Sequence, residues 1–232
     1  KNKPAPIFLY LNKYGNHTVH TDTKLSISDG WTDTGKVMPR GCHADRFGID
    51  YLIENGYGVA TLHESDISPD RKDGVFGVRA MFDETWGLIS AWSWGLMRCV
   101  DYLMMDKDIN HDRIFVTGHS RRGKAALWAG AQDARISMIC PHQSGTGGAA
   151  PSRKTNPDAE TVRQINDQFP HWFCETFKSY NDHEDALPFE QNDLLSLCAP
   201  RPLLVLNAKG DVWSDPSGTH DMVEKSRNQA NY

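Results

Sequence analysis

A short segment in the middle of the chain has the composition of a nucleophile elbow. Residues 116–124 read V-T-G-H-S-R-R-G-K, with an apolar stretch before them and a run of good helix formers after them. A serine at a strand-to-helix bend needs small neighbours, because the turn is strained and packs closely. The bend exposes the hydroxyl, and the following helix directs backbone N–H groups at the space where an oxyanion would form. We therefore predict that Ser120 is the nucleophile of a serine-type hydrolase.

The motif departs from the usual G-x-S-x-G at one position. Residue 122 is arginine, and the glycine comes one residue later, at Gly123. The spacing alone therefore leaves open a structural turn that carries a surface serine. Arg121 follows the nucleophile, and the backbone N–H at that position is the usual oxyanion donor. Lys124 comes one helical turn after Ser120, so we expect it on the same side of the helix.

The elements that must position this bend alternate along the chain. Five apolar stretches have the length of strands: residues 7–11, 58–62, 113–117, 136–140 and 203–207. Three segments have a helical pattern: residues 45–55, 86–105 and 124–131. Strands that alternate with helices predict the α/β class, with a mostly parallel central sheet and helices on both faces. Ligand sites in such sheets lie at the carboxyl ends of the strands.

The composition excludes several classes of protein. Lys plus Arg is 25 and Asp plus Glu is 30 in 232 residues, a net charge of −5, which argues against a nucleic-acid partner. No apolar run reaches the ~20 residues that a membrane helix needs. Five cysteines without zinc spacing are expected to be mostly free, buried thiols. No linker divides the chain, so we expect one catalytic domain over residues 1–232, incomplete at both ends.

Motifs along nearly the whole chain resemble the glucuronoyl esterases, carbohydrate esterase family 15. The nucleophile segment is similar to the family's G-C/H-S-R-x-G-K motif. Further similar segments are G-Y-G-V-A-T at 56–61, A-W-S-W-G at 91–95, S-G-T-G-G at 144–148, F-P-H-W-F at 169–173, A-P-R-P at 199–202 and D-V-W-S-D-P at 211–216. The resemblance implies an α/β-hydrolase fold.

The same resemblance implies a reaction and its setting. The reaction is hydrolysis of esters between the carboxyl of (4-O-methyl)glucuronic acid and an alcohol, as in lignin–glucuronoxylan linkages. No metal or cofactor is implied. The implied partner is a glucuronate ester or glucuronoxylan, and the implied location is secreted or periplasmic. We also expect a monomer, with neither nucleic acid nor membrane as a partner.

The resemblance also assigns roles to individual residues. The guanidinium of Arg121 would lie over the developing oxyanion. Lys124 and Glu160 would bind sugar hydroxyls. Trp213 would be a platform for the sugar, because an aromatic face packs well on the apolar face of a pyranose. The alternatives are solvated side chains for Arg121, Lys124 and Glu160, and core burial for Trp213.

The acid and the base of the triad are less well defined. One family position for the acid holds Gln143, which carries no charge. Asp211 matches the other position, where a carboxylate can orient the base, and Asp215 is its rival. The family's base lies beyond this loop, so we expect it beyond Tyr232. His220 is the one later histidine in this chain and is a weak candidate.

Three functions are compatible with these residues. We prefer a serine esterase of the glucuronoyl type. A feruloyl or acetyl esterase on the same fold is the second possibility. The third is a non-catalytic carbohydrate-binding relative that lacks the triad histidine.

Overall fold

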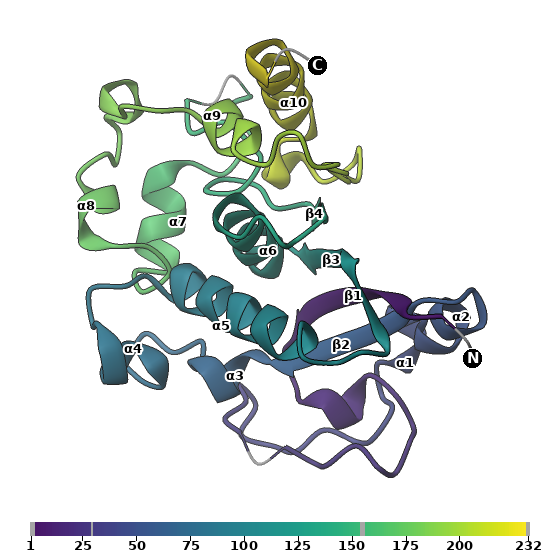
Figure 1. The fold of residues 1–232 in the computed structure, drawn as a ribbon. Helices are drawn as coiled ribbons and strands as arrows, with labels where there is room; N and C mark the ends of the chain where they lie inside the picture. Colours follow the sequence, from purple (N-terminus) through teal and green to yellow (C-terminus); the bar gives the residue numbers. More distant parts are fainter. Residues whose placement is uncertain (1–2, 29, 154–155, 231–232) are drawn as a thin grey trace.

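A parallel four-stranded sheet forms the centre of the computed structural model (Figure 1), which describes residues 3–28, 30–153 and 156–230. The strands are β1 (Ala5–Asn12), β2 (Gly58–His63), β3 (Ile109–His119) and β4 (Met138–His142). Their order in the sheet is β2-β1-β3-β4, and every neighbouring pair is parallel. Four of the five predicted strands are thus confirmed.

The fifth predicted strand pairs with β4 through two isolated bridges. Leu203 pairs with Ile139 and Leu206 pairs with His142, both in the parallel sense. Backbone hydrogen bonds connect the two segments on either side of Pro141. One rung of the ladder is missing because proline has no N–H to donate. The chain there continues the sheet without forming a regular strand.

Helices and long loops make up the chain between and after the strands. They are α1 (Ala44–Phe47), α2 (Ile49–Glu54), α3 (Glu64–Ile67), α4 (Val78–Phe82), α5 (Leu88–Leu103), α6 (Arg121–Gln132), α7 (Val162–Gln168), α8 (Glu175–Lys178), α9 (Gln191–Ser196) and α10 (Pro216–Ala230). The helix predicted at 45–55 is divided in two. Gly48 has a left-handed conformation with φ of 54°, which ends α1 before α2 begins.

The two faces of the sheet are covered by different helices. Ile7, Leu9 and Leu11 of β1 are buried in one core with α5 and α6, which lie side by side (Figure 1). Successive side chains of a strand point to opposite faces, so Tyr10 lies on the other side. Its ring stacks on Phe47 of α1, with 4.8 Å between the ring centroids. Helices therefore pack on both faces, as predicted for the α/β class.

The five cysteines are all free thiols, as predicted, but most of them are not fully buried. Cys140 and Cys198 are buried, Cys42 and Cys99 are partly buried, and Cys174 is exposed. Burial raises the pKa of Cys140 and of Cys198 to about 11, so both thiols are protonated at neutral pH.

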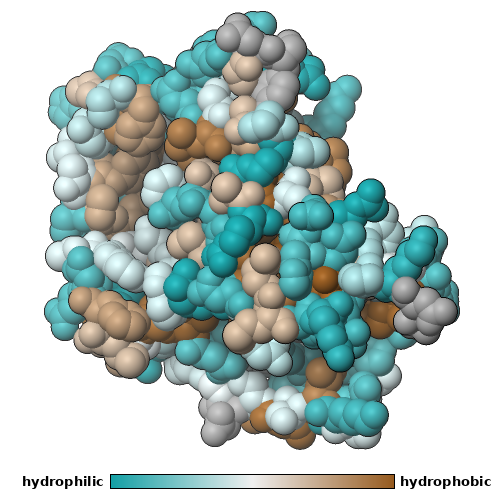
Figure 2. Space-filling model, viewed as in Figure 1, coloured by the Kyte–Doolittle hydropathy of each residue, from teal (hydrophilic) through white to brown (hydrophobic). Residues whose placement is uncertain are grey.

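The surface seen in Figure 2 is mostly hydrophilic, with apolar side chains gathered toward the left of the view near α8 and α9. Within the described residues, no helix combines the length and the apolar character needed to cross a membrane.

Candidate active site

Ser120 occupies a bend of one residue between β3 and α6. Its φ of 56° and ψ of −124° are unusual for a residue other than glycine, and such a conformation costs of order 1–3 kcal/mol. Two backbone hydrogen bonds hold it. The Ser120 N–H donates to the His142 carbonyl at 2.9 Å, and the Lys124 N–H donates to the Ser120 carbonyl at 3.1 Å. The predicted strand, bend and helix are present, and the Ser120 side chain is half-buried.

Glycine is required on both sides of this bend. A Cβ at Gly118 would lie 2.3 Å from the Arg122 carbonyl oxygen, and one at Gly123 would lie 2.9 Å from the Gly118 carbonyl oxygen. Both distances are shorter than real Cβ contacts. Gly123 therefore provides the close packing that a glycine at 122 provides in the usual motif.

Arg122 pairs with a buried acid. Its Nη2 donates to Oε1 of Glu64 at 2.7 Å, and its Nε lies 2.6 Å from Oε2. Glu64 is only 1% exposed. Burial raises the pKa of the Glu64 carboxyl, and the charge and hydrogen bond of Arg122 oppose that rise. The pair is a structural contact between α3 and α6.

Arg121 is held against two aromatic rings and a carboxylate. Its Nη1 donates to Oδ2 of Asp70. The guanidinium carbon lies 4.3 Å from the ring centroid of Trp172 and 4.9 Å from that of Phe169, which are cation–π distances. The alternative of a freely solvated arginine is therefore wrong.

Lys124 is buried beside the segment that follows β4. Its Nζ donates to the carbonyl oxygens of Ser144 and Thr146, the latter at 2.7 Å. Burial lowers the pKa of Lys124 to about 8; the charge of Glu160 raises it and that of Arg121 lowers it. The solvated alternative is wrong for Lys124 also.

Glu160 and Trp213 lie next to each other, close to Lys124. The Glu160 N–H donates to the Trp213 carbonyl at 3.1 Å, and the Glu160 carbonyl accepts from Oγ1 of Thr146 at 2.7 Å. Burial raises the pKa of Glu160, while the charge of Lys124 and a side-chain hydrogen bond with Trp213 lower it. Trp213 is 45% exposed, so its ring is not part of the core. The three residues predicted to bind the sugar thus come together.

Asp211 has the contacts expected of a fixed carboxylate. Its Oδ2 accepts from Nε2 of Gln143 at 2.6 Å and from Oγ of Ser214 at 2.5 Å. The hydrogen bond from Ser214 holds the pKa of Asp211 below its ordinary value, helped by Gln143 and by the charge of His119. Burial acts in the opposite direction. Residue 143, which occupies the other possible acid position, therefore orients this acid.

Asp215 has a different set of partners. It is buried, and its Oδ1 accepts from the Gly218 N–H at 3.0 Å and from Oγ of Ser217 at 3.1 Å. These are the contacts of a residue that caps the first turn of α10. Its backbone φ of 50° shapes the turn before that helix.

No histidine is in place to act as a base in the described part of the chain. All ten histidines of the sequence are described, and none of their imidazole rings has a hydrogen bond to the side chain of Ser120 or of Asp211 there. The side chain of His220 is 73% exposed and lies beside Asp221 on α10. His119 is exposed, although its charge reaches Asp211.

Sequence reasoning missed Asp70. Residues 66–77 have the turn-rich composition of a surface loop, and nothing in that loop indicates a buried acid. The one hint in the sequence was the aromatic segment 169–173, which packs against Arg121 and donates hydrogen bonds to Asp70.

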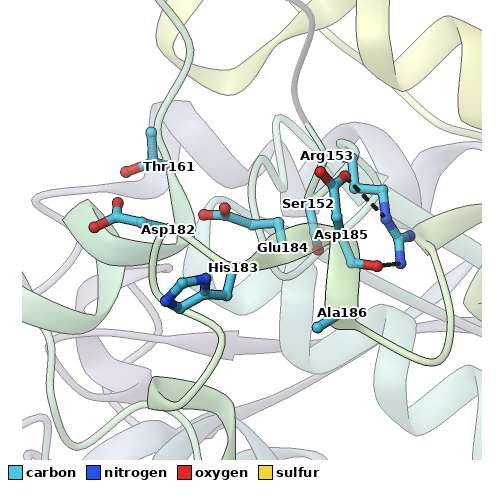
Figure 3. Close-up of a pocket in the computed structure, with 8 residues that line it drawn as sticks. All are labelled: Ser152, Arg153, Thr161, Asp182, His183, Glu184, Asp185 and Ala186. Carbon is cyan, nitrogen blue, oxygen red and sulfur yellow. Dashed lines mark hydrogen bonds and ion pairs between the residues drawn. The ribbon is translucent and has the colours of Figure 1, made fainter.

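Ser120 does not line either of two cavities in the described part of the chain. The first, of about 440 Å³, is lined by Ser152, Arg153, Thr161, Asp182, His183, Glu184, Asp185 and Ala186 (Figure 3). The second, of about 500 Å³, is lined mainly by apolar side chains and reaches Lys124. Within the described residues, no three His, Cys, Asp or Glu side chains are grouped to hold a metal ion.

Comparisons with known proteins agree with this geometry. A family model described as "Glucuronyl esterase, fungi" matches residues 20–229. Carbohydrate esterase MZ0003, from an unknown prokaryotic organism, is 45% identical over 233 residues, covering 92% of this chain and 54% of its own. A 4-O-methyl-glucuronoyl methylesterase from Hypocrea jecorina is 38% identical over 174 residues, covering 69% of this chain and 37% of its own.

A solved structure resembles nearly the whole chain. The glucuronoyl esterase from Solibacter usitatus superposes with a TM-score of 0.91 at 40% identity, over 99% of this chain and 62% of that one. This likeness and the mostly parallel sheet confirm the predicted α/β-hydrolase fold. The chain spans about half the length of the curated relatives it matches. The family model and the relatives together show that this chain belongs to the glucuronoyl esterase family.

Proposed function

We propose that the protein is a serine-type carboxylic ester hydrolase that cleaves esters of (4-O-methyl)glucuronic acid, as in lignin–glucuronoxylan linkages. The observation that carries this proposal is the arrangement around the start of α6. A serine on a strained bend is followed by a fixed guanidinium, and a buried lysine lies beside a buried glutamate and an exposed tryptophan. The name of the Hypocrea relative, a 4-O-methyl-glucuronoyl methylesterase, supports the substrate class.

The proposed reaction is a two-step acyl transfer. Oγ of Ser120 forms a bond to the ester carbonyl carbon. Its proton passes to a histidine base, which we place outside the described residues. The carbonyl oxygen becomes an oxyanion, which the N–H and the guanidinium of Arg121 stabilise. The bond to the alcohol then breaks, and the alcohol takes the proton from the base. Water hydrolyses the acyl-enzyme by the same steps in reverse.

The remaining residues provide orientation and recognition. Asp211 holds the base in the correct tautomer and stabilises the imidazolium. Lys124 donates to the sugar and Glu160 accepts from it, and the exposed face of Trp213 packs on the pyranose. The close packing of these three groups favours a uronic acid in the acyl pocket over a small acetyl group.

The test is hydrolysis of benzyl glucuronate by the full-length protein and its Ser120→Ala variant. We expect the variant to lose at least about 10³-fold in kcat, since removal of a serine nucleophile has effects of that order or larger. Ser137→Ala is the control. Ser137 directly precedes β4, at the opposite end of the sheet from Ser120, and its hydroxyl donates to the Ile114 carbonyl of β3. A wild-type rate in Ser120→Ala would refute the assignment of Ser120 as the nucleophile. Faster turnover of acetyl or feruloyl esters than of benzyl glucuronate would refute the proposed substrate class.

One observation favours a second candidate, a non-catalytic carbohydrate-binding protein. No described imidazole ring has a hydrogen bond to the side chain of Ser120 or of Asp211. Retained binding of glucuronoxylan, without turnover of any ester by the full-length wild type, would support this candidate over the esterase.

A polymeric substrate of plant cell walls also favours a secreted or periplasmic protein. We propose that location together with a monomeric state and a glucuronoxylan partner. Light scattering on the purified protein tests the monomer, and fractionation of the producing cells tests the location.

A further inference from the structure

Asp70 lies where side chains from three separate segments meet. Its Oδ1 accepts from Nε2 of His171 at 2.8 Å and from Nε1 of Trp172 at 2.9 Å. Its Oδ2 accepts from Nη1 of Arg121. The Asp70 side chain is 10% exposed. A carboxylate so well supplied with donors is fixed in position.

These donors also determine the charge of Asp70. Burial alone would raise the pKa of this carboxyl. The hydrogen bonds from His171 and Trp172 and the charge of Arg121 outweigh burial and hold the pKa well below its usual range. Asp70 is therefore a carboxylate throughout the pH range in which an esterase would be assayed.

Asp70 and the aromatic rings hold Arg121 from two directions. The rings of Phe169 and Trp172 are stacked at 3.8 Å, and the guanidinium lies against both. The Trp172 ring thus contacts Arg121 with its face and Asp70 with its N–H. In the described part of the chain, Nη1 is the one guanidinium nitrogen of Arg121 with a hydrogen bond, so Nε and Nη2 keep their donors for a ligand.

We propose that Asp70 is a positioning residue that fixes the Arg121 guanidinium so that its free donors meet the oxyanion formed at Ser120. This inference rests on the proposed ester hydrolysis. A long, flexible side chain stabilises an oxyanion only when its donors are within about 2.7–3.1 Å, and a misplacement of about 1 Å costs about 10²-fold in rate. Asp70 also offsets part of the positive charge of Arg121. We expect the gain from correct placement of the donors to exceed this loss of charge, because a donor that does not reach the oxyanion stabilises it little.

The test compares Asp70→Asn and Asp70→Glu with the wild type in the full-length protein, using benzyl glucuronate. Asp70→Asn is expected to lower kcat by about 30- to 100-fold with KM within about twofold, because the loss occurs in the transition state. Asp70→Glu restores part of kcat. The control is Asp133→Asn, which removes another arginine-paired carboxylate at the far end of α6. We expect Asp133→Asn to keep kcat within about twofold.

A double-mutant cycle separates positioning from a general structural effect. In the Arg121→Ala background, Asp70→Asn is expected to change kcat by less than about twofold, because the residue through which it acts is absent. Equal losses with and without Arg121, or a kcat within about threefold of wild type in Asp70→Asn, would overturn the proposal. Trp172→Phe keeps a ring under the guanidinium and removes the N–H donor to Asp70. It replaces Asp70→Asn if that variant does not fold, and wild-type kcat in it counts against the proposal.

The two hypotheses fail in different ways. If the wild type hydrolyses another ester but no glucuronate, the proposed substrate is wrong, and the ratio of kcat values on that ester still tests Asp70. If the wild type hydrolyses no ester, the rate at which an aryl phosphonate modifies Ser120 replaces kcat, because its phosphoryl oxygen occupies the oxyanion position. A wild type that neither turns over nor reacts overturns both hypotheses.

Discussion

Replacement of Gly118 by alanine tests whether contact between backbones holds the bend at Ser120. The new methyl group would lie 2.3 Å from the Arg122 carbonyl oxygen and 2.9 Å from the Gly123 nitrogen. The segments must separate until the first distance rises from 2.3 Å to at least 3.0 Å, a movement of about 0.7 Å. Both contacts are with backbone atoms, so no side chain can turn aside to make room.

This movement sets the size of the expected effect. It displaces the Ser120 hydroxyl relative to the Arg121 N–H. Since a misplacement of about 1 Å costs about 10²-fold, 0.7 Å predicts a fall in kcat of about 10- to 100-fold. Overpacking of this kind also lowers the free energy of unfolding by about 1–3 kcal/mol.

The assay combines urea unfolding with kcat on benzyl glucuronate, using the full-length protein. Gly58→Ala is the matched control, because Gly58 is also in a strand and its Cβ would meet nothing closer than Cγ1 of Ile7 at 3.4 Å. We expect Gly58→Ala to keep kcat within about twofold. A Gly118→Ala variant with wild-type kcat and an unchanged urea midpoint would refute the argument, since it would show that the bend tolerates a side chain at this contact.

Two further predictions concern the acid and the buried lysine. Asp211→Asn is expected to lower kcat by about 10²- to 10⁴-fold, because an amide does not stabilise the imidazolium. Asp215→Asn is expected to change kcat less than about threefold, since asparagine also caps helices; the opposite order of kcat values would make Asp215 the acid. KM is expected to rise as the pH passes about 8, where Lys124 loses its charge, and initial rates should show this rise in the wild type but not in Lys124→Met. Between about pH 8 and 10.5 the unfolded chain keeps the proton on this lysine, whose ordinary pKa is 10.5, whereas the folded protein has lost it. The free energy of unfolding should therefore increase with pH over this range. Urea titrations of wild type and Lys124→Met with the same pH dependence would contradict this.

The parts of the site that follow from local spacing were predictable from the sequence. The bend at Ser120 depends on residues within one helical turn, and it is present. The burial of Lys124 does not follow from local spacing, because its Nζ donates to carbonyls 20 and 22 residues away. The apolar stretches before and after the bend are long enough to specify a strand and a helix. The structure corrects these expectations only where a single residue interrupts the pattern. Pro141 removes a ladder hydrogen bond, and Gly48 divides a helix.

Contacts between distant residues could not be predicted in this way. Asp70 is 51 residues from Arg121, and Glu64 is 58 residues from Arg122. Both acids lie in or beside a segment whose composition predicts exposure, yet both side chains are at most 10% exposed and pair with an arginine from α6. Hydrophobic periodicity carries no signal for such a pair, since periodicity reports which face is apolar and not which charge will be matched.

The two cations Arg121 and Lys124 are held in different ways, and this difference determines what each contributes. Arg121 has a carboxylate partner in Asp70, and a guanidinium keeps its charge at every accessible pH. Lys124 is held by carbonyl oxygens, and no carboxylate lies within ion-pair distance of its Nζ in the described residues. Its burial is therefore only partly compensated in the free protein, as the pKa of about 8 shows. A polar ligand that reaches Nζ completes this compensation, so its binding is favoured there. A uronic acid carries hydroxyl oxygens in addition to its ester carbonyl, whereas an acetyl group has only the carbonyl, which is why the state of Lys124 supports the larger acyl group.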